Sequence, residues 1–174
     1  KRRFVWGPQA TKVFSLIEDI EKVIPMRKRI FPARALNVIA DFGHGFIYPG
    51  MAANLVKNPQ EFVALTCQSN SSNWGFNLLS KWPRADYVVA DEAEIRLTQH
   101  VEYGPLELLV QNEAKRMGTK LLSVTLGHKG CVVYAGNEKG FVYAPALARN
   151  IVDLLGSGDA FLAATAPLAY LGAP

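Results

Sequence analysis

Short apolar runs recur along the chain, and they limit what it can fold into. They cover the residue ranges 36–40, 62–66, 86–90 and 120–126. Each run is typical of a strand that is buried on both faces of a sheet. Apolar residues at helical spacing predict helices over the ranges 11–24 and 106–117. A short helix is expected over 49–57, and the Ala- and Leu-rich range 160–171 predicts the start of a buried helix. A hairpin is expected between residues 131 and 143. Strands that alternate with helices predict a three-layer α/β/α, Rossmann-like fold with a mostly parallel sheet.

Composition and charge exclude several classes of protein. The chain has 174 residues, 49% of them hydrophobic and 20% charged, as expected for one globular domain. The net charge is +4, but the basic residues near the start are interleaved with acidic and apolar ones, so no nucleic-acid surface is expected. No apolar run approaches the ~18 residues of a membrane span and no signal peptide is recognised, so we expect a cytoplasmic protein without a membrane partner.

One glycine-rich stretch, Gly156-Ser157-Gly158-Asp159, lies between a predicted strand end at 149–152 and a predicted helix. Glycine lets successive backbone N–H groups turn toward one point, and a helix N-terminus adds unpaired N–H groups with a partial positive charge. The stretch therefore predicts an anion-binding site. Asp159 by itself has two interpretations. It is either an N-cap of the helix, which is favoured for the stretch alone, or a functional carboxylate at the edge of the site.

Polar or glycine-rich clusters also follow the predicted strands, at residues 41–45, 68–77, 91–94 and 127–130. In an open α/β sheet the ligand crevice lies beyond the carboxyl ends of the strands, so these clusters are expected at one edge. Each cluster also has a plainer interpretation. The first and last are glycine turns, the second is a loop that binds its own backbone, and the third is an acidic first turn that offsets the helix dipole.

Together, these motifs resemble those of the ribokinase-like (PfkB) carbohydrate kinases. The resemblance is carried by Asp153-x-x-Gly156-Ser157-Gly158-Asp159 against D-x-x-G-A-G-D, Thr125-x-Gly127-x-x-Gly130 against T-x-G-x-x-G, and Asp91-x-x-Glu94 against N-x-x-E. In addition, Asp41-Phe42-Gly43-His44-Gly45 resembles the D-Y-G-K-G motif of the heptose-phosphate kinase branch, with His44 in place of Lys.

The resemblance implies an enzyme that uses ATP and Mg²⁺ to phosphorylate a hydroxyl of a sugar or sugar phosphate. In the family, the final Asp of the signature is the general base, and the glycine turn is an anion hole for the transferred phosphoryl group. Catalytic roles therefore fall to Asp159, Gly156, Ser157 and Gly158. Contacts with the nucleotide fall to Asp153, Thr125, Gly127 and Gly130.

The N-x-x-E motif of the family acts on magnesium and phosphate through bound water, which implies a metal role for Glu94 and Asp91. Oxygen ligands with retained waters also suit Mg²⁺ on chemical grounds. Substrate contacts are expected at Asp41, Gly43, Gly45, Asn70 and Asn73. For residues 68–77, an amide wall that faces a polar ligand and a loop that binds its own backbone are equally supported.

The resemblance covers roughly residues 36–174, so residues 1–174 are expected to form one partial ribokinase-like domain. The family's N-terminal substrate and lid part and its C-terminal end are expected to lie outside this chain. A non-catalytic family member that binds a nucleotide or sugar for regulation is the alternative. An unrelated Rossmann-like module is disfavoured because no G-x-G-x-x-G follows the first strand. Whether the protein is a homodimer stays open.

Overall fold

The computed structural model describes residues 36–147 and 156–173. The helix expected over residues 11–24, the strand end at 149–152 and Asp153 lie outside these ranges, so those expectations stay predictions. Within the two described ranges, no helix is both long enough and apolar enough to cross a membrane.

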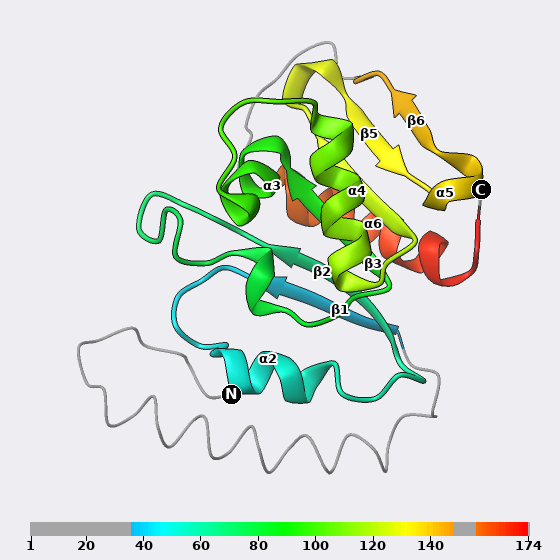
Figure 1. Cartoon of the computed structure of the whole chain (residues 1–174). Coiled ribbons are helices and arrows are strands. Elements are labelled where there is room, and N and C mark those ends of the chain that lie inside the picture. The colour runs from blue at the N-terminus through cyan, green and yellow to red at the C-terminus, as the bar shows by residue number, and fades with distance from the viewer. Residues whose placement is uncertain (1–35, 148–155, 174) are drawn as a thin grey trace. The chain divides into compact units, whose positions relative to one another are not determined.

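The described strands form one six-stranded sheet in the sequential order β1 to β6 (Figure 1). The strands are β1 (Leu36–Asp41), β2 (Phe62–Cys67), β3 (Tyr87–Asp91), β4 (Leu121–Thr125), β5 (Cys131–Tyr134) and β6 (Phe141–Ala144). Strands β1 to β4 pair in parallel, whereas β5 runs antiparallel to both β4 and β6. The mostly parallel sheet and the hairpin predicted from the sequence are both confirmed.

The helices connect these strands and cover the sheet. They are α2 (Pro49–Leu55), α3 (Glu92–Gln99), α4 (Leu106–Met117), α5 (Gly136–Lys139) and α6 (Ser157–Tyr170), with the 3₁₀ helices η1 (Leu79–Lys81) and η2 (Gly127–Lys129). Helix α4 occupies the predicted range, and α2 begins where predicted but ends two residues before the predicted end. Helix α5 is a single short turn inside the connection of the hairpin. Helix α6 begins three residues earlier than predicted, at Ser157 rather than Ala160.

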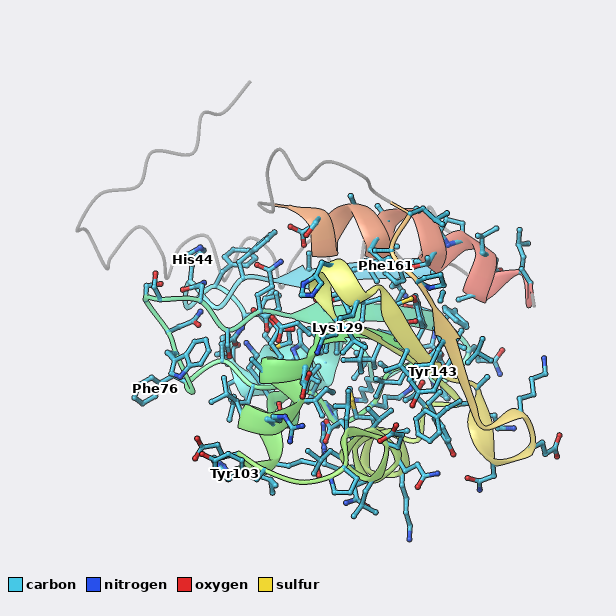
Figure 2. All side chains as sticks on the ribbon, turned by 90° about the horizontal axis from the view of Figure 1, so that it is seen from above. His44, Phe76, Tyr103, Lys129, Tyr143 and Phe161 are labelled. Carbon is cyan, nitrogen blue, oxygen red and sulfur yellow. The ribbon has the colours of Figure 1, made fainter. Side chains whose placement is uncertain are left out.

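Helices lie on both faces of the sheet because successive strand residues point to opposite sides. Val63 and Leu65 join the larger core cluster, to which α2, α3 and α4 contribute. Ala64, Tyr87 and Val89 join a second cluster on the other face, with α6. Figure 2 shows α6 and α4 on opposite sides of the strands. The three-layer architecture is therefore confirmed.

Hydrogen bonds as well as apolar contacts attach α6 to the sheet. The hydroxyl of Tyr87 lies 3.0 Å from Ser123 Oγ and 2.8 Å from Thr165 Oγ1. Burial raises the pKa of Tyr87, which keeps this phenol protonated. Because Thr165 lies in the middle of α6, these bonds fix the helix against β3 and β4 and so help to set the position of its N-terminus.

Candidate active site

A cavity of about 370 Å³ opens where the parallel strands end. It is lined by Thr66, Gln68, Ser69, Val89, Ala90, Asp91, Glu94, Thr125, Gly156, Ser157 and Gly158. Four segments that are far apart in the sequence thus meet here, at the ends of β2, β3 and β4 and at the start of α6. Most of the predicted catalytic and metal-binding residues lie along this cavity. No individual role was predicted for Gln68 or Ser69.

The start of α6 forms one wall of the cavity. Its N-cap is Gly156, with a left-handed φ of 75°, and among the described residues no side chain caps the helix. The first N–H groups of an α-helix have no partner within the helix, which makes a helix start a common site for anions. A Cβ placed on Gly158 would meet no described atom within 4 Å. Close packing therefore does not explain this glycine, and the space beside the first turn is open.

Asp159 lies in the first turn of α6 but is not its N-cap. The N-cap interpretation of this residue is therefore wrong. Its Oδ1 instead accepts a hydrogen bond of 2.9 Å from Gln68 Nε2. The carboxylate is half-buried and faces the end of β2, so it is held by a side chain from across the cavity.

Glu94 takes part in capping α3 and also lines the cavity. The backbone N–H groups of Asp91 and Ser69 donate to its Oε2 and Oε1, at 2.9 and 3.1 Å. Asp91 in turn accepts from the N–H of Glu94 at 2.7 Å, which completes a capping box. Burial, followed by the negative charge of Asp91, raises the pKa of Glu94 to about 7, and Asp159 contributes in the same direction.

The acidic character of the cavity suits a magnesium ion. Within the described ranges, no residue that lines the cavity carries a positive charge. Phosphate groups would therefore be repelled by the carboxylates of Glu94, Asp91 and Asp159 unless a cation were bound. The described residues hold no cluster of three or more acidic, His or Cys side chains that could enclose a metal. Mg²⁺ typically uses one or two carboxylates and fills its remaining positions with waters and substrate phosphates. The oxygen donors present fit that mode of binding.

Thr125 lines the cavity, but the two glycines of the same predicted motif do not. Gly127 and Gly130 lie at the start and the end of the η2 turn between β4 and β5. The carbonyl of Gly130 accepts a hydrogen bond of 2.8 Å from the N–H of Leu126, which closes this turn. The turn follows β4 at the predicted edge, and its contact with a nucleotide stays a prediction.

Asp41 has protein partners on several sides. It is 3% exposed and forms an ion pair with Lys81, and its Oδ2 accepts a 3.0 Å hydrogen bond from Trp82 Nε1. Its Oδ1 accepts from the N–H of Gly43 at 3.1 Å. These contacts give Asp41 a structural use at the end of β1, whereas its contact with a substrate stays a prediction.

The amides of the loop after β2 bind neighbouring backbone. Asn73 Nδ2 donates to the carbonyls of Phe42 and Gly43, at 3.0 and 3.3 Å, and Asn70 Nδ2 also donates to Phe42 at 3.0 Å. Gly43 has a φ of +69°, and a Cβ at this position would lie 2.1 Å from Asn73 Nδ2, so only glycine fits. Within the loop itself, the N–H of Asn70 donates to Asn73 Oδ1 at 2.8 Å and the N–H of Ser72 donates to Asn70 Oδ1 at 3.0 Å, as expected for a loop that binds its own backbone. An amide wall that faces a ligand stays a prediction.

A second cavity of about 450 Å³ lies between the loops that follow β1 and β2. Its lining includes Gly43, Gly45, Asn73, Phe76 and Lys81. His44 and Phe76, which come from these two loops, lie at the same end of the molecule in Figure 2. The predicted residues are therefore divided between two cavities. Asp91, Glu94 and the range 156–158 line the first, and Asp159 follows this range but is not part of the lining. Of the predicted substrate residues, Gly43, Gly45 and Asn73 line the second cavity, whereas Asp41 and Asn70 line neither.

Comparison with known proteins gives a family and a fold. Residues 53–167 match the profile described as pfkB family carbohydrate kinase. Fructokinase-1 of Oryza sativa subsp. japonica is 38% identical over 87 residues, which are 50% of this chain and 26% of that protein. Among solved structures, phosphofructokinase-2 from Escherichia coli, in complex with substrates and products, has a TM-score of 0.68 at 14% identity. The similarity covers 99% of this chain and 55% of the phosphofructokinase-2 chain.

Ribokinase from Thermotoga maritima has a TM-score of 0.60 at 20% identity. The similarity covers 79% of this chain and 44% of the ribokinase chain. At these identities the structural similarity establishes the fold, which is that of the ribokinase-like kinases. The match spans about a quarter of the length of the fructokinase and about half of each kinase structure.

Proposed function

The chain belongs to the pfkB family of carbohydrate kinases, and on that premise we propose that it carries the catalytic end of an ATP-dependent sugar kinase. The observation that carries the proposal is the single cavity in which the start of α6 meets the acidic first turn of α3. An anion-binding helix start beside carboxylates is the combination that phosphoryl transfer needs, because that reaction depends mainly on positioning and charge stabilisation.

Asp159 is proposed as the general base. Gln68 occupies its Oδ1, so Oδ2 is the oxygen assigned to accept the proton of the sugar hydroxyl. A half-buried carboxylate at the mouth of an anion site is well placed for this step. The attacking hydroxyl must lie between the base and the phosphoryl group that the helix start holds.

The backbone N–H groups at Gly156, Ser157 and Gly158 are proposed to stabilise the transferred phosphoryl group. The positive end of the helix dipole and the N–H groups of the first turn together favour an anion at this position. The open space beside Gly158 leaves room for a phosphoryl group to approach the backbone. Preorganised donors of this kind commonly provide a large part of catalysis.

Mg²⁺ and ATP are proposed as metal and co-substrate. Glu94 and Asp91 would hold the ion, in part through waters, and the ion would neutralise phosphate charge during transfer. Thr125 lines the same cavity and is proposed to lie beside the nucleotide. Without a cation, the carboxylates that line this cavity would oppose the binding of a polyphosphate.

The acceptor is proposed to be a sugar or a sugar phosphate. The matched relative is a fructokinase, which supports a hexose-like acceptor. The resemblance of residues 41–45 to the heptose-phosphate kinase branch supports a phosphorylated one. The loops with Gly43, Gly45 and Asn73 border the second cavity, which is the proposed position of the distal part of the acceptor.

Replacing Asp159 with Asn in the full-length protein tests the proposal. Asn preserves the shape and hydrogen-bonding capacity of the side chain but cannot serve as a base, so turnover should fall by ~10²–10⁴. The melting temperature and the affinity for ATP should stay close to the wild-type values, because Asp159 does not cap α6. ADP release measured with a panel of sugars and sugar phosphates provides the turnover.

Glu138 is an exposed acid in the short helix α5, and Glu138→Gln is the matched control. This variant should keep the wild-type turnover. Wild-type turnover in Asp159→Asn would show that Asp159 is not the base. If the unmodified full-length protein binds nucleotide or sugar but phosphorylates nothing in the panel, the regulatory alternative replaces the kinase.

A further inference from the structure

Gln68 lines the cavity, and its side chain holds Asp159. It follows the last residue of β2, and its Nε2 donates to Asp159 Oδ1 at 2.9 Å although 91 positions separate the two residues in sequence. We propose that Gln68 is a positioning residue that orients the carboxylate of Asp159 for proton transfer. This inference rests on the function proposed above, in which Asp159 is the base.

The backbone of Gln68 is fixed on both sides. Its N–H donates to the carbonyl of Asp41 at 2.9 Å, and its own carbonyl accepts from Asn77 Nδ2 at 3.0 Å. Asn77 is 4% exposed and donates to the Asp41 carbonyl as well, at 3.1 Å. One buried amide therefore joins the ends of β1 and β2, so that little freedom remains in Gln68 besides its side-chain torsions.

An ion pair between Lys81 and Asp41 holds Asn77, the residue that fixes the backbone of Gln68. Lys81 pairs with the carboxylate of Asp41 and donates to Asn77 Oδ1 and to the carbonyl of Ile47. Buried pairs contribute little net stability because desolvation offsets their attraction. Their effect here is geometric, because the pair holds the amide of Asn77 that fixes Gln68. The charge network at the end of β1 thus reaches the proposed base through two amide side chains.

The hydrogen bond from Gln68 restricts a torsion that matters for catalysis. The terminal torsion of an Asp side chain is broad, so a carboxylate without a partner samples many orientations. A donor from a fixed backbone narrows that range. The next residue has a parallel role, since the N–H of Ser69 donates to Glu94 Oε1 at 3.1 Å. Gln68 and Ser69 together set the position of the base relative to the carboxylate proposed to hold the metal.

The first test is Gln68→Met in the full-length protein. Met has nearly the same length but cannot donate, so the carboxylate loses its orienting partner. We expect kcat to fall about 10-fold or more, because small misplacements of reacting groups are costly. KM for ATP and for the sugar should stay within about twofold, since the side chain contributes no uniform binding. Gln68→Glu should lower kcat further, because two carboxylates repel each other.

Gln99→Met is the matched control. Gln99 is also half-buried and its Nε2 donates to the carbonyl of Leu109, but it lies at the end of α3. The same substitution there removes an amide hydrogen bond without touching the cavity, so kcat should not change. If both Met variants lower kcat equally, Gln68 has only a general structural effect and the inference is wrong.

The decisive measurement repeats Gln68→Met in the Asp159→Asn background. A residue that acts through Asp159 has nothing left to orient there, so the residual turnover should change by less than about twofold. The same fold-loss in both backgrounds overturns the inference, as does a Gln68→Met variant with wild-type kcat or with a raised KM alone. Failure of the proposed function is seen separately, because Asp159→Asn itself would then keep wild-type turnover.

Discussion

Glu94 shows how one residue is shared between folding and the proposed chemistry. Its carboxylate accepts N–H groups from Asp91 and Ser69, so it ties the start of α3 to the loop after β2. It is only 7% exposed, and burial disfavours its charged form. A bound cation would favour the charged form of Glu94, because the positive charge would compensate for the poor solvation of the carboxylate.

The first prediction concerns the pH dependence of stability. In the folded protein Glu94 keeps its proton up to about pH 7, whereas in the unfolded chain it loses the proton near its ordinary value of 4.5. Between these values the folded state binds more protons, so its stability falls as pH rises from 4.5 through 7. The loss is on the order of 3 kcal/mol for a pKa raised from 4.5 to about 7.

Urea unfolding at pH 5 and pH 8 in the absence of Mg²⁺ measures this difference. Glu94→Gln cannot titrate, so its stability should change less between the two pH values than that of the wild type. Glu102→Gln removes an exposed acid instead and should behave like the wild type. Equal pH dependence in the wild type and Glu94→Gln would show that burial does not shift the pKa of Glu94.

The sequence predicts residues of this site when their chemistry is local. Asp159 and Glu94 stand at fixed offsets within short motifs, so a resemblance could find them. Gln68 could not be assigned, because its role depends on a contact with a helix that begins far along the chain. Asp41 was assigned to a substrate from the resemblance of residues 41–45, and that contact stays a prediction. Its pairing with Lys81 and Trp82 could not be predicted, because these partners are not visible in the local pattern.

At the scale of elements, the first turn of α6 combines an unusual composition with an open surface. Two glycines begin the helix, yet a glycine within a helix costs roughly 0.5–1 kcal/mol relative to alanine. Gly156 is needed for its positive φ of 75°. Gly158 has helical geometry and no close neighbour within 4 Å in the described structure. Its stability cost is therefore not explained by folding.

The second prediction is that Gly158→Ala separates stability from activity. Alanine favours the helix and fits the open space, so the variant should be more stable by up to about 1 kcal/mol. If the phosphoryl group approaches the backbone there, the added methyl obstructs it and turnover falls. Thermal melting and ADP release of the full-length variant measure the two effects. A variant that is stabilised and fully active would exclude Gly158 from the anion hole.

Ala163→Gly is the converse control for the same helix. Ala163 is exposed on α6 and away from the cavity lining. The substitution should lower stability by about 1 kcal/mol through helix propensity and leave turnover unchanged at low temperature. A large loss of turnover in this control would mean that activity follows the stability of α6 rather than the space at its start.

Element positions were easier to predict than element ends. Continuous apolar runs identified β2 to β4 because a strand covered on both faces needs apolar residues throughout. The run of β1 also predicted a strand, but Val38 is 49% exposed, so the expected burial on both faces is wrong for β1. The start of α3 was visible in the acids at Asp91 and Glu94. The start of α6 was placed too late, because Gly156 rather than Asp159 is the N-cap and glycine carries no side-chain signal.

At the scale of the whole molecule, the described residues cover the two faces of the sheet unequally. The face with α2, α3 and α4 contains the large cluster that includes Trp82, Ile95 and Met117. The face with α6 contains a much smaller one, in which Leu162 and Ala166 are the buried side chains of the helix. Among the described residues, the helix that carries the proposed base therefore has few buried apolar contacts, and such elements open at lower cost than the core.

The last prediction follows from this asymmetry. Leu162 is 1% exposed, so Leu162→Ala should cost ~2–5 kcal/mol through lost burial and a cavity. Because the loss is local to α6, activity should disappear on heating before the sheet unfolds. The temperature of half-maximal activity should then fall further than the melting temperature measured by circular dichroism.

Leu168→Ala is the control, since Leu168 lies in the same helix but is 54% exposed. This variant should change stability by less than ~0.5 kcal/mol. If activity and circular dichroism are lost together in Leu162→Ala, α6 unfolds only with the whole domain.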